Sequence, residues 1–391
     1  MISAVILVIV SGTNLILSED TWFIVLVLTV VGTLVYFIHL TVLYSYVPEL
    51  TDDIQKLTSY NGTYIAIRTA VMVPILPLVI GLTFLFNGNP PKFEMGSVEF
   101  DVRLAKISQI ICLVLVCISF TMTFWRGLKS RPSKTQAMID EKKIKIHETG
   151  VAIWKENRPL FWYLIALLPL SNTLMAFASI AITFVTSFLG MDGVQIALTI
   201  LLFSFFGVLG SKVHPLIAKR INLMNDLKLI VTCWIALLVV TGLVVNSQER
   251  KTLFLFATGI WGFAFGWAVP SMRTVYITLI PSGQEAEYMG IYMLFSGGFV
   301  WFPPLLFTIL NEVGIAMNII VVIFSSVFVI TLFFLFMVGD YEKAVENAKI
   351  LSKDEDQSEK ATVPVDKIND ASQSNEENDI ERNISNNEQS T

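Results

Sequence analysis

The sequence is poor in the side chains that carry most enzyme and metal chemistry. It has 3 cysteines and 3 histidines among 391 residues, and only 15% of its residues are charged. The cysteines lie inside apolar runs and form no CxxC pair, so neither a zinc site nor a disulfide framework is expected. The sequence also lacks the H-E-x-x-H, G-x-S-x-G and G-x-x-x-x-G-K-S/T patterns, which argues against metalloprotease, hydrolase and ATP-driven chemistry. We therefore expect no enzyme activity, no cofactor and no metal.

Apolar residues, in contrast, make up 54% of the chain, and the mean hydropathy is +0.66. A soluble domain, which has about 25% charged residues, cannot bury so much apolar surface, so lipid must act as part of the solvent. Segments facing lipid must be helical, because open strand edges leave backbone groups without partners. We predict an all-α, polytopic membrane helical bundle with about ten spans. The spans are residues 2–18, 22–46, 64–86, 106–125, 160–188, 194–214, 228–246, 253–277, 288–310 and 315–338.

Charge divides the chain into four parts. Nine Lys and Arg residues gather in residues 126–158, and such basic loops stay in the cytoplasm. This linker separates an N-terminal helical half (1–125, four spans) from a C-terminal six-helix half (159–338). With an even number of spans, both termini are cytoplasmic. The tail, residues 339–391, is polar and acidic, and we expect it to be disordered and available to cytosolic partners.

The count of four and six spans suggests a transporter. Many transporters consist of two six-helix halves joined by a cytoplasmic loop. The present chain fits that plan if its first helical pair is absent, and we favour this interpretation over a true ten-span protein. No basic stripe is interleaved with aromatic residues, so nucleic-acid binding is not expected.

Polar residues inside membrane helices face neighbouring helices or water-filled cavities. Helical spacing gathers them on three faces: Gly32, Tyr36, His39 and Tyr46 in the second span; Asn172, Ala176, Ser179, Thr183 and Thr186 in the fifth; and Gly259, Gly262, Gly266, Pro270 and Arg273 in the eighth. The glycines allow a neighbouring backbone to approach closely. Arg273 shares their face and should point into the bundle, as a gate or as the partner of an anion. Simple helix packing is the commoner role of such faces and is an alternative for each of them. The alternative for His39 is a hydrogen bond to a neighbouring helix, and for Arg273 it is contact with lipid phosphates near the cytoplasmic end.

Three stretches resemble a known family. Residues 266–310 contain Arg273 followed by Leu279-Ile280-Pro281, Gly283, Glu285-Ala286-Glu287 and Gly290, which is similar to the "SRS…LIPPGREAEFFG" pattern of the autophagy-related protein 22-like effluxers. These effluxers are a branch of the major facilitator superfamily. Residues 46–50 (YVPEL) and the pair of stretches 163–166 and 189–191 are similar to further family patterns. Ser282 and Gln284 differ from the first of these patterns. Residues 171–173 (SNT) stand where the family typically has SDG in its seventh helix.

The resemblance covers residues 2–339 and implies helices three to twelve of a major-facilitator fold. It assigns the second, fifth and eighth spans to helices that line the central cavity of that fold. It also implies efflux of amino acids across the vacuolar membrane after autophagic breakdown. An alternative is a transport-inactive membrane scaffold, or a truncated product, whose acidic tail recruits partners.

We hypothesise a substrate pathway within this frame. Asn172, Ser179 and Thr183 would offer neutral hydrogen bonds, with Tyr36 and His39 across the cavity. Arg273 would hold a carboxylate or a gating partner. His39 would make transport sensitive to pH, because histidine titrates near neutrality. Glu285 and Glu287, in the loop 281–287, are the predicted gating residues.

Overall fold

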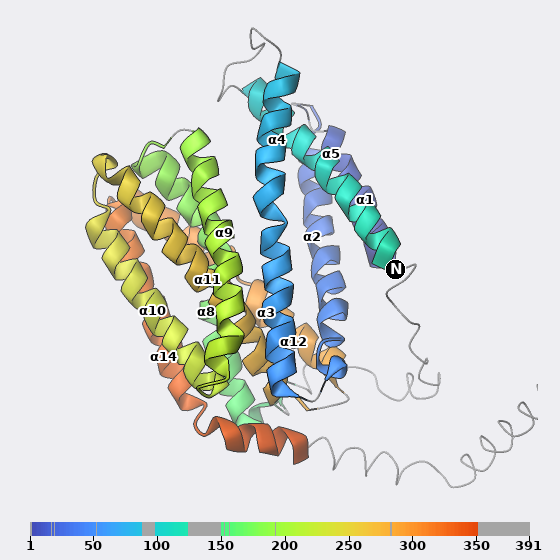
Figure 1. Cartoon of the computed structure of the whole chain (residues 1–391), viewed down its shortest axis with the longest axis vertical. Coiled ribbons are helices and arrows are strands. Elements are labelled where there is room, and N and C mark those ends of the chain that lie inside the picture. The colour runs from blue at the N-terminus through green and yellow to red at the C-terminus, as the bar shows by residue number, and fades with distance from the viewer. Residues whose placement is uncertain are drawn as a thin grey trace, which may run out of the picture.

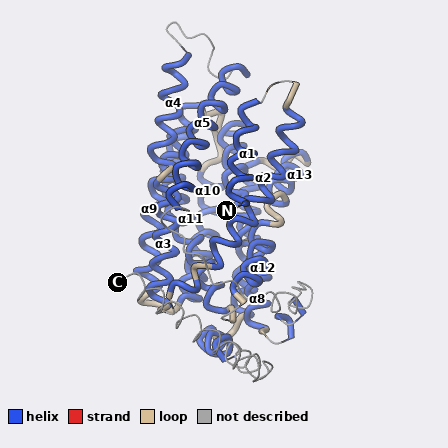
Figure 2. The backbone as a smooth tube through the Cα atoms, turned by 90° about the vertical axis from the view of Figure 1, so that its right-hand side faces the viewer, coloured by secondary structure: helices blue, strands red, loops and turns tan. Residues whose placement is uncertain are grey.

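The structure, a computed structural model, describes residues 2–87 except 17, 19 and 52, residues 98–123, and residues 150–350 except 152, 156, 192, 282 and 283. The acidic tail from residue 351 and most of the basic linker therefore lie outside the described residues. The described part is built of helices and contains no strand (Figures 1 and 2). This confirms the prediction of an all-α membrane bundle.

The helices follow one another along the chain, with two numbers left out where the linker lies. They are α1 (Ile2–Thr13), α2 (Trp22–Ser45), α3 (Ile54–Ala70), α4 (Met72–Asn87), α5 (Val98–Met122), α8 (Arg158–Thr183), α9 (Gly193–Ala218), α10 (Leu223–Val244), α11 (Lys251–Leu279), α12 (Glu285–Gly297), α13 (Phe302–Glu312) and α14 (Met317–Met337). A π-helical turn, Phe184–Phe188, continues α8. A further short helix, residues 341–350, crosses the lower end of the bundle in Figure 1.

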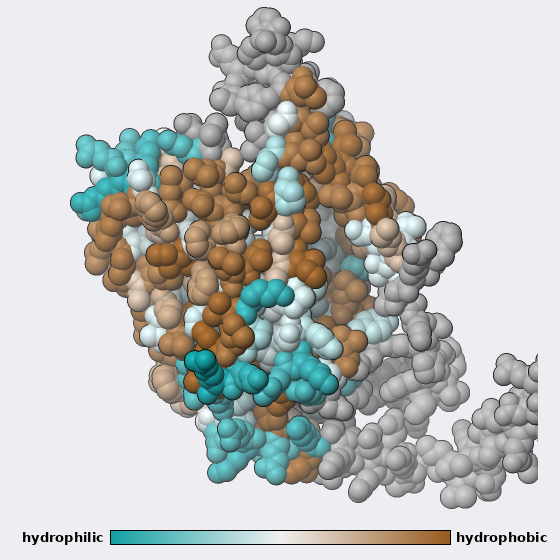
Figure 3. All heavy atoms as spheres, viewed as in Figure 1, coloured by the Kyte–Doolittle hydropathy of each residue, from teal (hydrophilic) through white to brown (hydrophobic). Residues whose placement is uncertain are grey.

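Nine helical runs in the described ranges are long and apolar enough to cross a membrane. They correspond to nine of the ten predicted spans. The first predicted span, residues 2–18, is shorter than expected, because α1 has 12 residues and is followed by a 3-10 turn, Asn14–Ile16. On the surface, apolar side chains form a broad band, and hydrophilic side chains gather at the lower end and the upper left (Figure 3). This pattern suits a bundle surrounded by lipid.

The predicted span 64–86 begins ten residues too late. The helical run starts at Ile54 and continues through α3 and α4, with only Val71 outside both helices. Asp53 starts it, because its carboxylate accepts the backbone N–H groups of Gln55 at 2.8 Å and Lys56 at 3.4 Å. The first ten residues of α3 are mostly polar, so a search for apolar segments misses them, although the N-cap signal is in the sequence.

The predicted span 288–310 is one membrane crossing made of two helices. A short turn, residues 298–301, separates α12 from α13. Gly297 and Gly298 lower the helix propensity there. Pro303 has no N–H group to donate to the residue 299 carbonyl, so the helical ladder cannot continue unbroken. A break at this depth needs hydrogen-bond partners from a neighbouring helix.

The linker divides the helices into two groups along the chain, α1–α5 and α8–α14. The main core cluster lies within α8–α14 and extends into α2 and α3. The groups meet where α2 packs on α12 and where α3 packs on α9 and α11. Helices α2, α3, α9, α11 and α12 are therefore the main helices at the contact between the two groups.

The closest helix pair in the described part is α9 with α11. Added Cβ atoms at Gly262 and Gly266 would overlap the carbonyl oxygens of Phe203 and Gly207, and one at Gly210 would overlap that of Phe263. The glycine face predicted on the eighth span thus permits close approach, as expected. This contact fixes α11 against the C-terminal group and so sets the position of Arg273.

Candidate functional site

Arg273 lies in a cage of aromatic rings at the contact between the two helix groups. Its side chain is 3% exposed. The guanidinium carbon is 3.8 Å from the ring centre of Tyr44 on α2 and 5.2 Å from that of Tyr64 on α3. Tyr292 on α12 also lies within electrostatic range of it. We call Tyr44, Tyr64 and Tyr292 the tyrosine cage; Tyr44 and Tyr64 hold the guanidinium by cation–π contacts.

The cage itself spans both groups of helices. The Tyr44 and Tyr64 rings meet edge to face, with centres 5.9 Å apart and hydroxyl oxygens 3.5 Å apart. Tyr44 is buried with 4% exposed, as is Tyr292. A neighbouring contact, 3.2 Å from Asn61 Nδ2 on α3 to Thr274 Oγ1 on α11, also crosses between the groups. A movement of one group relative to the other must therefore change the surroundings of Arg273.

The charge of Arg273 has no carboxylate partner among the side chains that the structure describes. Its Nε atom is buried and has no hydrogen-bond partner there. Burying a cation is costly unless it is paired, and Arg presents a planar fork of donors that suits a carboxylate. The arrangement can accept one carboxylate of a bound molecule.

Tyr36 lies near this cage, whereas His39 lies on another side of α2. Tyr36 is 40% exposed and within electrostatic range of Arg68, Tyr44 and Arg273. His39 is half-buried against α1 and α5: its Nδ1 is 3.1 Å from Ser3 Oγ, and its ring centre is 5.3 Å from that of Phe120. The structure thus brings Tyr36 toward Arg273 and places His39 in helix packing.

Asn172 supports the break between α12 and α13. It is 2% exposed, and its Nδ2 donates to the carbonyl oxygens of Leu168 and Phe295, each at 2.7 Å. Its Oδ1 accepts the Phe299 N–H at 3.0 Å. The adjacent Ser171 donates to the Ser296 carbonyl at 2.9 Å. Two side chains of α8 therefore satisfy the backbone groups that the break leaves open.

Replacing Asn172 by alanine is expected to destabilise the protein by about 1 to 3 kcal/mol, because buried backbone groups at the break lose their partners. The midpoint of thermal unfolding in detergent, followed by size exclusion, measures the effect. Ser325→Ala is the matched control, since the Ser325 hydroxyl bonds only to Val322 within α14. Equal midpoints for Asn172→Ala and the control would contradict the supporting role.

Ser179 and Thr183 lie on an exposed face of α8, away from the contacts of Asn172. The Ser179 hydroxyl donates to the Ala176 carbonyl at 2.8 Å, and that of Thr183 to the Ser179 carbonyl at 3.0 Å. Both hydroxyls are therefore satisfied within their own helix. Their oxygens can still accept a hydrogen bond from a molecule passing along this face.

Glu285 and Glu287 stand in the first turn of α12, at partly exposed positions. Carboxylates there interact favourably with the helix dipole. Part of the predicted gating loop, residues 282 and 283, lies outside the described residues. Among the residues that are described, no group of three or more His, Cys, Asp or Glu side chains could hold a metal ion.

Comparison with known proteins identifies the family. The family described as "Vacuole effluxer Atg22 like" matches residues 1–349. The chain belongs to this Atg22-like family.

Two curated relatives bear a related name. Autophagy-related protein 22-1 of Sclerotinia sclerotiorum is 27% identical over 197 residues, which cover 47% of this chain and 30% of that protein. Autophagy-related protein 22 of Botryotinia fuckeliana is 26% identical with the same coverage. The matched region thus spans less than a third of these relatives.

A solved structure shows the same fold. It is the crystal structure of a bacterial homologue of the iron transporter ferroportin in an outward-facing state. The TM-score is 0.54 at 14% identity, and the match covers 86% of this chain and 81% of that one. The Atg22-like chain therefore has a major-facilitator-like fold, as expected from the sequence.

Two groupings of side chains in this Atg22-like chain, one at the site and one beside it, are not found by sequence reasoning. Tyr44, Tyr64 and Tyr292 belong to three helices, and their spacing within each helix does not show that they meet around Arg273. The pairing of His214 with Asp226 likewise joins two helices. A usable signal exists for the second: an ionisable residue inside an apolar span, such as Asp226, marks a functional or paired position.

Proposed function

We propose that the chain forms the membrane body of a secondary transporter that moves amino acids out of the vacuole by alternating access, in connection with autophagy. Both termini would face the cytosol, and the acidic tail would be free to bind cytosolic partners there. The observation that carries the proposal is the buried Arg273, which has no carboxylate partner among the described side chains. Membership of the Atg22-like family supports the proposed direction of transport, which is efflux, and the proposed location in the vacuolar membrane.

The substrate carboxylate would bind the guanidinium of Arg273. Tyrosine hydroxyls at Tyr36 and Tyr292 would donate hydrogen bonds to the same molecule. Ser179 and Thr183 would serve further along the pathway, on the exposed face of α8, while Asn172 would keep the α12–α13 break in shape. Because the cage contains residues from both helix groups, a bound carboxylate would change the balance between two arrangements of those groups.

Glu285 and Glu287 would act as a gate at the start of α12. Their negative charge would pair with basic cytosolic residues when this end of the pathway is shut. His39 stays a candidate for pH sensitivity through its contact with Ser3 on α1.

A comparison of ligands tests the proposal. An α-amino acid and the amine that remains after removal of its carboxylate differ in the group that Arg273 is proposed to bind. We expect the amine to compete with a labelled amino acid about 100-fold less well, because a buried charge left without its partner costs 2 to 5 kcal/mol. Competition is measured by equilibrium binding to the full chain in detergent. Equal competition by both compounds would contradict carboxylate recognition.

A further inference from the structure

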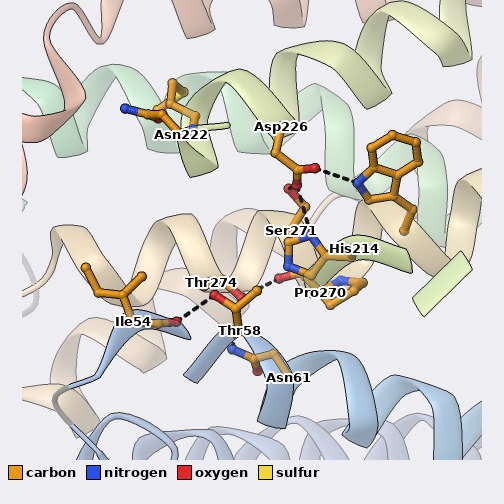
Figure 4. Close-up of polar contacts among 11 residues, drawn as sticks. Ile54, Thr58, Asn61, His214, Asn222, Asp226, Pro270, Ser271 and Thr274 are labelled. Atoms are coloured by element: carbon orange, nitrogen blue, oxygen red, sulfur yellow. Dashed lines mark hydrogen bonds and ion pairs between the residues drawn. The ribbon is translucent and has the colours of Figure 1, made fainter. Parts of the chain in front are cut away.

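A second buried charge lies inside the C-terminal group of helices. Asp226, near the start of α10, and His214, near the end of α9, are both 0% exposed. Asp226 Oδ2 is 2.9 Å from His214 Nδ1. Figure 4 shows the carboxylate and the imidazole beside Ser271, above Asn61 and Thr274.

Three donors surround the Asp226 carboxylate. Trp267 Nε1 donates to Oδ1 at 2.8 Å, and Ser271 Oγ donates to Oδ2 at 2.8 Å. The indole nitrogen is a donor only. His214 Nδ1 is the third donor. The two carboxylate oxygens therefore accept three hydrogen bonds, which hold the carboxylate in place.

This arrangement fixes the state of the histidine. Because Nδ1 donates its hydrogen to Asp226, the neutral imidazole carries its lone pair on Nε2. Nε2 is buried and has no hydrogen-bond partner among the described residues. Without a proton on Nε2 the pair carries one negative charge; with a proton there it is an ion pair with no net charge.

Other charges on the packed helices are engaged elsewhere or exposed. Lys212 on α9 donates to Thr63 at 3.1 Å, and Lys228 on α10 lies 4.5 Å from the Phe336 ring centre. Arg273 on α11 is held by the tyrosine cage. Three further charged side chains belong to the helices packed here. Lys251 on α11 donates to the Gly190 carbonyl, and Lys56 and Arg68 on α3 are exposed. Helix α14 has no charged side chain. The pair is thus the local site at which a proton changes the buried charge.

Helix α11 connects this pair to Arg273. Trp267 and Ser271, which hold Asp226, lie within six residues of Arg273 on the same helix. Thr274, the next residue, accepts the hydrogen bond of Asn61 from the other helix group at 3.2 Å. Pro270 removes one hydrogen bond of the helical ladder between these contacts, which permits α11 to bend there.

We propose that the His214–Asp226 pair is a proton-binding site that couples proton movement to substrate movement through α11. The inference rests on the proposed transport function. The proton comes from water on one side of the membrane, forms the Nε2–H bond of His214, and returns to water on the other side. No other bond is made or broken. The neutral pair holds Trp267 and Ser271 differently from the charged pair, and that difference shifts the part of α11 that carries Arg273.

Vesicles containing the full chain separate coupling from binding. One assay measures accumulation of labelled amino acid driven by an imposed pH gradient; the other measures exchange of labelled for unlabelled amino acid without a gradient. For Asp226→Asn and His214→Gln we expect accumulation to fall about tenfold or more, a typical size for a coupling between two sites. Exchange should stay within about twofold of the unmodified chain. Lys228→Gln, a charge change on α10 two residues from Asp226, should keep both activities.

Each outcome has a definite meaning. Undiminished accumulation in folded Asp226→Asn and His214→Gln overturns the proton site, as does an unmodified chain that exchanges but ignores the gradient. An unmodified chain that does not exchange overturns the proposed function itself. If both variants fail to fold by size exclusion, Ser271→Ala decides: loss of one donor to the carboxylate should lower gradient-driven accumulation and leave exchange unchanged. Undiminished accumulation in Ser271→Ala overturns the inference.

Discussion

The variant Arg273→Gln is expected to lose measurable amino-acid binding while remaining folded. The guanidinium is the positive charge that the tyrosine cage surrounds, and removing the partner of a buried carboxylate costs about 2 to 5 kcal/mol, or about 30-fold or more in affinity. Folding should be affected little, because the variant loses cation–π contacts of about 2 kcal/mol or less but no longer buries an unpaired charge. Equilibrium binding and the midpoint of thermal unfolding measure the two quantities.

Arg273→Lys sharpens this test. Lysine keeps the charge, but its ammonium group cannot form two parallel hydrogen bonds to a carboxylate. We expect an affinity between those of the unmodified chain and Arg273→Gln. Lys212→Gln is the matched control, because it removes an exposed cation at a neighbouring position that donates only to Thr63. Unchanged binding in Arg273→Gln would remove Arg273 from the substrate site.

The variant Gly266→Ala is expected to destabilise the protein by about 3 kcal/mol, through overpacking. On an isolated helix the same change is stabilising by about 1 kcal/mol. Here the new methyl group would overlap the Gly207 carbonyl oxygen, which is backbone and cannot rotate away. Helices α9 and α11 must move apart, and the loss of contact outweighs the gain in helix propensity. The midpoint of thermal unfolding in detergent measures the effect.

Gly290→Ala is the control for this change. Nothing lies within 4 Å of a Cβ atom added at Gly290 on α12, so the gain in helix propensity should appear there as a small increase in stability. A rise in stability for both variants would contradict the close contact between α9 and α11. A fall for both would point to a general need for glycine in these helices.

The membrane helices could be predicted from the sequence because a bilayer demands long apolar segments. The prediction failed where a membrane helix begins with polar residues. Helix α3 begins at Ile54 because Asp53 caps it, although the residues that follow are polar. It correctly gave α12 and α13 as one span, but it missed the break inside that span, since Gly297 and Gly298 do not reduce hydropathy enough to mark it.

The candidate site shows a different limit. Helical spacing identifies residues that share a face, and it placed Arg273 inside the bundle as observed. It does not identify the neighbouring helix. Gly32 and His39 share a face of α2, but that face meets Val10 and Ser3 of α1, whereas Tyr44 faces Arg273. Contacts between helices distant in sequence follow from packing of the whole bundle.

A structure of the full chain with a bound amino acid tests the central claim most directly. We predict that the carboxylate oxygens of the ligand lie within hydrogen-bond distance of the Arg273 guanidinium, between α2, α3, α11 and α12. An amino acid bound elsewhere, with Arg273 still stacked on Tyr44 and free of ligand, would contradict the account.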